Sequence, residues 1–212
     1  MKILFYGDSI TDALREKENL SSIMAFGAGY VMQTAGRLYE KSPVYYEIIN
    51  RGISGNRIVD LYARIKKDVW NIKPDLLSIL VGINDIWHEI EFENGVDLKR
   101  FDKIYRMMID DTIAVLPNTK FILCEPFVCH GSATDKAYDR FCEVFDYAKV
   151  VKKIADDYGL YFLPLQKVID DANEKYGNIF LSDGVHPTVQ GAVLIANEWI
   201  KLFNDIEHEV KK

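Results

Sequence analysis

The sequence begins Met1-Lys-Ile-Leu-Phe-Tyr-Gly-Asp-Ser-Ile-Thr-Asp12, and this stretch decides the fold class. Ile3–Tyr6 is an uninterrupted apolar run, which favours a strand covered on both faces over a strand with one solvated face. Gly7 then interrupts the run, and polar residues follow it. The stretch therefore predicts a buried strand that ends in a turn, as at the start of an α/β domain.

Four more apolar runs follow, each bounded by Gly, Pro, Asn or Asp and separated by helical patterns. The runs are Val44–Ile49, Leu76–Val81, Phe121–Cys124 and Leu160–Leu163. The helical patterns cover about Gly29–Glu40, Arg57–Lys67, Lys99–Val115, Lys136–Tyr158 and Thr188–Phe203. Because strands that alternate with helices form parallel sheets, we predict an α/β fold, a three-layer α/β/α sandwich. We expect a five-stranded parallel sheet with the flavodoxin-like strand order 2-1-3-4-5.

Length and composition indicate an ordinary globular enzyme or binding domain. The chain has no internal repeat and no linker-like tract, so we expect residues 1–212 to form a single domain. A net charge of -6 argues against nucleic acid or an anionic membrane surface as a partner. No apolar run reaches the roughly 18 residues of a transmembrane helix. The N-terminus passes directly into a strand and leaves no room for a signal peptide, so we expect a cytoplasmic protein.

The three cysteines, Cys124, Cys129 and Cys142, have neither the spacing of a metal site nor that of a Cys-x-x-Cys redox pair. No histidine cluster accompanies them. We therefore expect reduced, largely buried thiols and no metal.

The residues that follow the apolar runs carry the chemistry. In a doubly wound sheet, ligands bind beyond the carboxyl ends of the strands. Gly7–Asp12, Asn50–Arg57 and Gly82–Asp85 each follow a predicted strand, and Asp183–Pro187 precedes the last helix. These four segments are expected to meet at one edge of the sheet.

Each segment also has a structural explanation when it is taken alone. Ser9-x-x-Asp12 fits a helix capping box, and Gly55 could simply supply a positive φ in a turn. Asn84 could cap the helix that follows it, and an Asp183–His186 pair could lie on a surface loop. These explanations are independent of one another. A chance meeting of all four at one sheet edge is improbable, which favours a catalytic site.

The residue types match the requirements of nucleophilic catalysis. A serine hydroxyl such as that of Ser9 needs a base to take its proton, and a neutral His186 can do so near pH 7. Asp183, three residues before His186, can accept the other imidazole N–H and fix the tautomer. The backbone N–H groups of Ser9 and Gly55 and the side-chain amide of Asn84 can form the oxyanion hole.

These residues occur in the order found in a known family. Gly7-Asp-Ser-Ile10, Gly55, Gly82-x-Asn84-Asp85 and Asp183-x-x-His186-Pro187 resemble the four sequence blocks of the SGNH (GDSL-like) hydrolases. The resemblance extends over nearly the whole chain. It implies a cofactor-free esterase with Ser9, Asp183 and His186 as the triad. It also implies Ser9, Gly55 and Asn84 as the oxyanion hole.

Further motifs narrow the resemblance to the intracellular bacterial acetyl-xylan esterases. They are Gly27-x-Gly29-Tyr-Val31, Asn50-x-Gly-Ile-Ser-Gly-Asn56 and Gly82-Ile-Asn-Asp-x-Trp87. The resemblance implies an acetylated-sugar substrate and a homo-oligomer. One departure is Ser182, where the subgroup often has an aromatic residue. We expect the substrate to contact Asp8, Ile10, Arg57, Trp87, His88 and Val185.

Other classes of protein fit the sequence less well. An FMN binder needs a phosphate loop after the first strand, where Asp8 and Asp12 place negative charge. A phosphorylatable receiver domain needs a lysine after the fifth strand, and Pro164-Leu-Gln166 supplies none. A catalytically silent carbohydrate-binding relative has no need of a serine–imidazole pair. A short-chain lipase or thioesterase-type acyl hydrolase stays open as an alternative to the acetylesterase.

Overall fold

The sheet of the computed structural model has five strands, all parallel, in the order β2-β1-β3-β4-β5. The structure describes the backbone of residues 1–210 and the side chains of residues 1–207. The strands are β1 (Lys2–Gly7), β2 (Glu47–Gly52), β3 (Leu76–Leu80), β4 (Lys120–Cys124) and β5 (Tyr161–Leu163). This order confirms the predicted flavodoxin-like sheet. The predicted single domain ends at residue 212, and its last two residues lie outside the described part.

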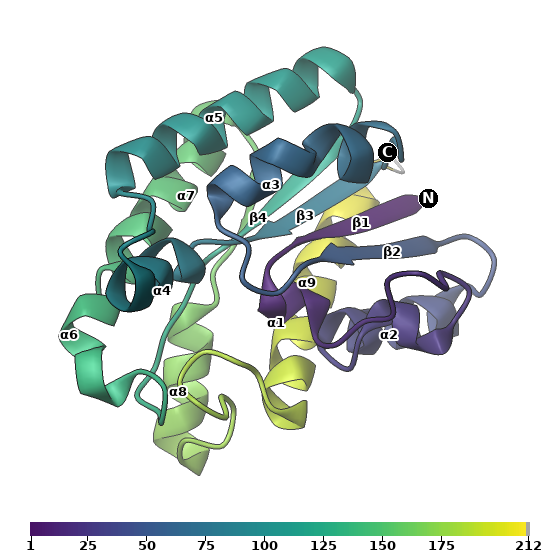
Figure 1. Ribbon diagram of the computed structural model, residues 1–212. Helices are drawn as coiled ribbons and strands as arrows, with labels where there is room; N and C mark the ends of the chain where they lie inside the picture. The colour runs from purple at the N-terminus through teal and green to yellow at the C-terminus, as the bar shows by residue number, and fades with distance from the viewer. Residues whose placement is uncertain (211–212) are drawn as a thin grey trace.

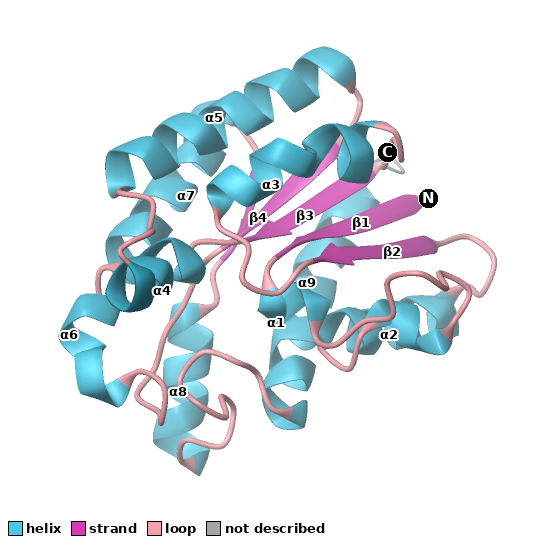
Figure 2. Cartoon of the chain, in the orientation of Figure 1, coloured by secondary structure: helices cyan, strands magenta, loops and turns pink. Residues whose placement is uncertain are grey.

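Helices cover both faces of the sheet, so the three-layer α/β/α architecture is confirmed (Figure 1). Figure 2 shows α3, α5 and α7 on one side of the strands and α2 and α9 on the other. The α-helices are α1 (Ser9–Asp12), α2 (Tyr30–Lys41), α3 (Ile58–Ile65), α4 (Ile83–Phe92), α5 (Leu98–Val115), α6 (Tyr138–Phe141), α7 (Val144–Tyr158), α8 (Gln166–Tyr176) and α9 (Val189–Val210). Short 3-10 turns occupy Ile23–Phe26 and Asp135–Ala137, and Lys66–Trp70 continues α3 as a π-helix.

The largest error of the sequence prediction lies at β2. We expected the strand at Val44–Ile49, whereas it begins at Glu47, and Val44 is 92% exposed. The strand instead continues through polar residues to Gly52, because its backbone pairs with β1 up to the Gly7–Gly52 pair. Pairing with the neighbouring strand therefore outweighs side-chain type at this end of the sheet.

Three helical segments also differ from the prediction. The pattern over Lys136–Tyr158 is divided into a 3-10 turn, α6 and α7, with a break at Cys142 and Glu143. The predicted helical ranges do not include α4 or α8, since both helices are short and largely polar on their outer face. The helix α4 matters for function because it begins at the end of β3.

The longest helix, α9, is anchored to the sheet by Trp199. This buried indole stacks on Phe203 at a ring-centroid distance of 5.1 Å and lies 5.0 Å from Phe5 of β1. Its Nε1 donates to the hydroxyl of Ser78 in β3 at 3.0 Å. Within residues 1–210, no helix is long and apolar enough to cross a membrane.

Candidate active site

Three side chains form a continuous row at the carboxyl end of β1. The hydroxyl of Ser9 lies 2.9 Å from Nε2 of His186, and Nδ1 of His186 lies 2.7 Å from Oδ2 of Asp183. Ser9 is the first residue of α1, whose N-cap is Asp8, which accepts the backbone N–H of Ile10 at 3.0 Å. Ser9 therefore has no capping function, and its hydroxyl is available to the imidazole.

The loop that carries Asp183 and His186 is fixed by its own hydrogen bonds. Oδ1 of Asp183 accepts the backbone N–H groups of Val185 at 2.9 Å and of His186 at 2.8 Å. The backbone N–H of Ser182 donates to the carbonyl of His186 at 2.8 Å. These bonds hold both catalytic candidates in one rigid turn, so little ordering is needed when a substrate binds.

The hydrogen bond between Asp183 and His186 lowers the pKa of the carboxylate and raises that of the imidazole. Burial acts to raise the pKa of Asp183, but hydrogen bonds from His186 and from two backbone N–H groups lower it to about 2. The hydrogen bond to the Asp183 carboxylate raises the pKa of His186 against the opposing effect of burial. A carboxylate of this kind favours the imidazolium, which is the form a general base reaches after it has taken a proton.

The predicted oxyanion donors Gly55 and Asn84 lie on the segments that follow β2 and β3. Gly55 has a φ of +81°, a conformation that favours glycine. Asn84, in the first turn of α4, is 6% exposed, and its side-chain amide donates to the carbonyl of Asn56 at 3.2 Å. This bond joins the Asn84 amide to the residue that follows Gly55 and leaves a second amide hydrogen free for a ligand.

A pocket of about 420 Å³ opens beside Ser9 and His186, and much of its wall is apolar. The lining residues are Ser9, Ile10, Ala13, Leu14, Ala28, Gly29, Ser54, His186 and Pro187. Ala13 and Leu14 both adopt positive φ, at 43° and 61°, and this turns the chain sharply after α1. Sequence reasoning missed both residues, because alanine and leucine carry no signal for this conformation.

Trp87, His88 and Ile10 lie near this site, and their predicted contact with substrate stays a prediction. The Trp87 ring is 5.9 Å from the His186 ring and 5.5 Å from that of Phe141. Nε2 of His88 lies 3.8 Å from the point where a Cβ on Gly55 would be. Ile10 lines the pocket.

Asp8, Arg57 and Val185 have structural partners instead. Asp8 and Val185 are 1% and 0% exposed and offer almost no surface to a substrate. Arg57 binds the Asp60 carboxylate at 2.9 Å and the carbonyl of Asn94 at 2.5 Å. These three side chains are therefore not part of the proposed substrate site.

Neither a metal nor a cysteine nucleophile is suggested by the remaining titratable groups. Among the described residues, no group of three or more His, Cys, Asp or Glu side chains is arranged to hold a metal ion. Burial raises the pKa of the Cys124 thiol to about 12 and that of Cys129 to about 11. Thiols with such pKa values stay protonated near neutral pH and are poor nucleophiles.

A parallel sheet of this order, with a serine–imidazole–carboxylate row at its carboxyl edge, is the arrangement of an α/β serine hydrolase. Comparison with known proteins identifies the family. Residues 5–194 match the GDSL-like Lipase/Acylhydrolase family, and the chain belongs to this family. It is a carboxylic ester hydrolase, as predicted.

The chain is similar to an acetylxylan esterase of Geobacillus stearothermophilus, with 33% identity over 94% of this chain and 92% of that protein. The solved structure of that organism's acetylxylan esterase Axe2 has a TM-score of 0.83 and 32% identity, over 95% of this chain and 93% of the other. A protein of Parabacteroides merdae, assigned as a GDSL-like lipase, has a TM-score of 0.88 and 36% identity, over 95% and 94%.

Three other Axe2 structures are of catalytic mutants, in which a serine, an aspartate or a histidine is replaced by alanine. The aspartate and histidine of that enzyme are three residues apart.

Proposed function

We propose that this enzyme hydrolyses acetyl esters through an acyl-enzyme on Ser9, with His186 as general base and Asp183 as its orienting carboxylate. The observation that carries this proposal is the row of two short contacts, 2.9 Å from Ser9 to His186 and 2.7 Å from His186 to Asp183. The catalytic mutants of Axe2 support it, because they involve the same three residue types with the same Asp-to-His spacing.

The proposed reaction has two halves that share one base. Oγ of Ser9 attacks the ester carbonyl carbon while Nε2 of His186 takes the hydroxyl proton. As the tetrahedral intermediate collapses, His186 returns this proton to the leaving alcohol, and the acyl group stays on Ser9. A water then attacks the acyl carbon and loses a proton to His186. When this second intermediate collapses, the bond from the acyl carbon to Oγ of Ser9 breaks, His186 returns the proton to Oγ, and the carboxylic acid leaves.

The negative charge that develops on the carbonyl oxygen needs preorganised donors. We assign this role to the backbone N–H groups of Ser9 and Gly55 and to the free amide hydrogen of Asn84. Fixed donors of this kind are worth more in a site from which water is excluded than they would be in bulk solvent. Asn84, at 6% exposure, meets that condition.

The substrate we propose is an acetylated xylo-oligosaccharide or a related acetylated sugar. The names of the Geobacillus relatives, acetylxylan esterase and acetyl-xylooligosaccharide esterase, support this choice. The indole of Trp87, 5.9 Å from His186, is suited to stack on a sugar face. Ser182 stands where the subgroup often has an aromatic residue, so Trp87 would supply the aromatic surface on this side.

A short-chain lipase or thioesterase-type acyl hydrolase is the second candidate. The apolar wall of the 420 Å³ pocket, formed by Ile10, Ala13 and Leu14, favours it, because an acetyl group alone would leave much of this wall exposed. Comparison of acetyl, butyryl and octanoyl p-nitrophenyl esters separates the two. A kcat/KM that falls with chain length supports the acetylesterase, and one that rises supports the acyl hydrolase.

The first test compares hydrolysis of p-nitrophenyl acetate by the wild type and by Ser9→Ala. We expect the variant to lose the activity and to keep the circular dichroism spectrum of the wild type, because Ser9 is only half-buried at the first position of α1 and is not part of the core. Ser21→Ala, which changes an exposed serine of the following loop, is the matched control and should be as active as the wild type. Full activity in Ser9→Ala would refute the proposed nucleophile.

Two further expectations accompany the proposal, a cytoplasmic location and self-association. Cell fractionation tests the first. Sedimentation-velocity measurement of the purified protein tests the second, and a single species of monomer mass would refute it.

A further inference from the structure

A single buried carboxylate connects the segment of Gly55 to the helix of Ser9. Asp12 is the last residue of α1 and is 2% exposed. Its Oδ2 accepts the backbone N–H of Ser54 at 2.9 Å and the hydroxyl of Ser54 at 2.8 Å. Ser54 is joined directly to the peptide nitrogen of Gly55. The Asp12 side chain therefore links the helix of the nucleophile to Ser54, the residue immediately before the N–H of Gly55 that would bind the oxyanion.

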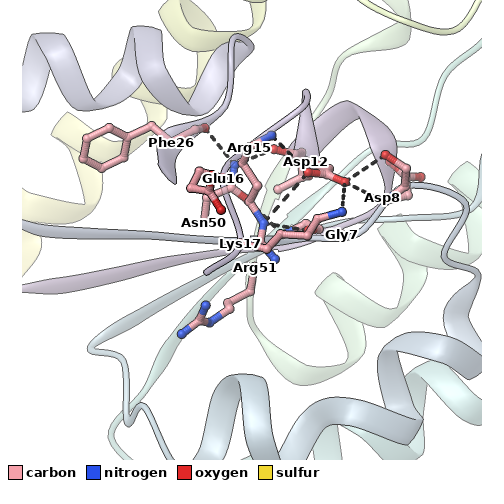
Figure 3. Close-up of polar contacts among 12 residues, drawn as sticks. Gly7, Asp8, Asp12, Arg15, Glu16, Lys17, Phe26, Asn50 and Arg51 are labelled. Carbon is pink, nitrogen blue, oxygen red and sulfur yellow. Dashed lines mark hydrogen bonds and ion pairs between the residues drawn. The ribbon is translucent and has the colours of Figure 1, made fainter. Parts of the chain in front are cut away.

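Two basic residues complete the surroundings of this carboxylate, and Figure 3 shows it next to both of them. Nζ of Lys17 lies 3.1 Å from Oδ2, and the backbone N–H of Arg15 donates to Oδ1 at 3.2 Å. Nε of Arg15 donates to the carbonyl of Gly52 at 2.8 Å. Burial acts to raise the pKa of Asp12, but the hydrogen bonds from Ser54 and Lys17 lower it below its ordinary value. Asp12 is therefore ionised at neutral pH.

The end of β2 packs so closely against α1 that the backbone at Gly52 has no room to shift. A Cβ on Gly52 would lie 2.2 Å from the backbone nitrogen of Asp12. The side-chain amide of Asn50 donates to the carbonyl of Thr11 at 2.6 Å, and its oxygen accepts the N–H of Gly52 at 2.8 Å. The end of β2 is thus held against α1. The next residues, Ser54 and Gly55, are held by the bonds of Ser54 to Asp12 and by the backbone bond from the N–H of Asn56 to the carbonyl of Ile53 at 3.2 Å.

We propose that Asp12 is a positioning residue for ester hydrolysis, which holds the Ser54–Gly55 peptide group at the correct distance from Ser9. The inference rests on the function proposed above. A backbone donor stabilises an oxyanion only when it lies within about 2.7–3.1 Å of the place where that oxygen forms. Gly55 has no side chain to fix its own orientation, so the hydrogen bonds of the neighbouring Ser54 help to set the direction of its N–H.

The proposed role requires a carboxylate at position 12, and an uncharged polar side chain of the same size would not serve. Both oxygens of Asp12 face donors, namely two from Ser54, one from Lys17 and one from the backbone of Arg15. An asparagine would direct its NH₂ group at one of these sets of donors. The Asp12→Asn substitution preserves shape and size but breaks this pattern, so it tests the carboxylate itself.

The experiment measures kcat and KM for p-nitrophenyl acetate in the wild type, Asp12→Asn, Asp97→Asn and Ser9→Ala. Asp97 is the control, because it also accepts a backbone N–H three residues later, from Arg100 at 3.0 Å, in an exposed position at the start of α5. Each preparation is also titrated to its end point with a serine-reactive phosphonate, and the labelled fraction is counted by mass spectrometry. This count gives kcat per functional site.

For Asp12→Asn we expect kcat per titrated site to fall by about 10- to 100-fold with KM changed less than about twofold, because the donor is displaced rather than removed. Asp97→Asn should match the wild type. Wild-type kcat per titrated site in Asp12→Asn overturns the inference. The inference is overturned even if fewer sites of the variant react with the phosphonate. A smaller number of functional sites with normal kcat per site is what a purely structural role of Asp12 would produce. Full activity in Ser9→Ala would instead refute the proposed function.

Ser54→Ala decides the matter if Asp12→Asn does not fold. It removes the hydroxyl bond to Asp12 and keeps the backbone one. We expect a loss of about two- to fivefold in kcat per titrated site, in line with a weakened hydrogen bond of about 0.5–1 kcal/mol. An unchanged kcat per titrated site in this variant overturns the inference.

Discussion

The imidazole of His186 is subject to two opposing effects. Its hydrogen bond to Asp183 raises its pKa, whereas burial lowers it, and the carboxylate prevails. The same bond and two backbone N–H groups hold the pKa of Asp183 at about 2, so this carboxylate stays ionised throughout the range in which the imidazole titrates. A base of this kind must be neutral to accept the serine proton.

From this we predict the pH dependence of the wild type. Protonation of His186 at low pH removes the base, so kcat/KM should fall on the acid side with a midpoint above the ordinary histidine value of 6.5. The measurement is the kcat/KM of p-nitrophenyl acetate between about pH 4 and 9, spanning the ordinary range of histidine. A rate that stays flat down to about pH 4 would exclude a histidine base.

The Asp183→Asn substitution should lower the pKa of His186, which the Asp183 carboxylate raises in the wild type. Without the carboxylate, the pKa of His186 loses the effect that raises it, so the acid-side midpoint should move to lower pH. The rate at the plateau should fall by up to roughly 10⁴, because the asparagine stabilises the wrong imidazole tautomer. Both changes are read from one pH profile of the variant, and an unmoved midpoint would contradict the assignment.

Asn84→Ala tests the oxyanion hole. Removal of one oxyanion donor lowers kcat by about 10²–10³, and we expect a loss of this size with little change in KM. Steady-state kinetics with p-nitrophenyl acetate measure it. Since Asn84 also bonds the carbonyl of Asn56, the thermal midpoint should be recorded alongside. Unchanged kcat would remove Asn84 from the proposed oxyanion hole.

At the scale of elements, the loop after β4 supplies a side chain that caps a helix about 40 residues further along the chain. Glu125 follows β4, and its carboxylate accepts the backbone N–H groups of Leu165 at 2.7 Å and of Gln166 at 2.9 Å, at the start of α8. Gln166 in turn exchanges hydrogen bonds with the backbone of Val128. The connection after β4 is therefore a structural brace, and its acidic residue lies outside the lining of the pocket beside Ser9.

Glu125→Ala should accordingly affect stability and leave catalysis unchanged. Loss of a capping carboxylate lowers the free energy of unfolding by about 0.5–2 kcal/mol. Urea denaturation followed by circular dichroism measures the loss, and Glu174→Ala, an exposed glutamate within α8, is the matched control. A fall in kcat with an unchanged free energy of unfolding would contradict this prediction. The connection after β4 would then belong to the substrate site.

At the scale of the whole molecule, the strand order places the site. The strand β1 pairs with both β2 and β3, so the segments that follow these three strands emerge side by side. They carry Ser9, Gly55 and Asn84 respectively, and the loop before α9 brings Asp183 and His186 to the same edge. The packing of α9 against the sheet, through Trp199, thus helps to position two of the three residues of the proposed triad.

Trp199→Ala should destabilise the protein strongly. It removes a side chain that is fully buried between Phe5 and Phe203 and leaves a cavity, for which about 3–5 kcal/mol of unfolding free energy is the usual loss. The measurement is urea denaturation, with Tyr176→Ala as the control because Tyr176 is a 59% exposed aromatic. A change below about 1 kcal/mol would show that α9 does not depend on this contact.

Local patterns in the chain were sufficient for the buried central strands of the sheet, and the motifs that follow these strands were sufficient for the family resemblance. Ile3–Tyr6, Leu76–Val81 and Phe121–Cys124 are apolar because both faces of a parallel sheet are covered, so their composition alone identified buried strands. The rule that parallel strands present their carboxyl ends to ligands then placed Gly7–Asp12 and Gly82–Asp85 at one edge. These inferences depend only on neighbouring residues and on general rules of topology.

Other features depend on contacts between residues far apart in the sequence, and only the tertiary structure decided them. The strand β2 extends over polar residues to Gly52 because β1 pairs with it there, and no local pattern records such a partner. The pocket wall at Ala13 and Leu14 arises from backbone angles that neither residue favours by itself. Asp12, which fits a capping box with Ser9, instead binds Ser54, 42 residues away. Hydrogen bonds between residues so far apart in the sequence form only when the packed fold brings the two residues together. For that reason the sequence could not reveal them.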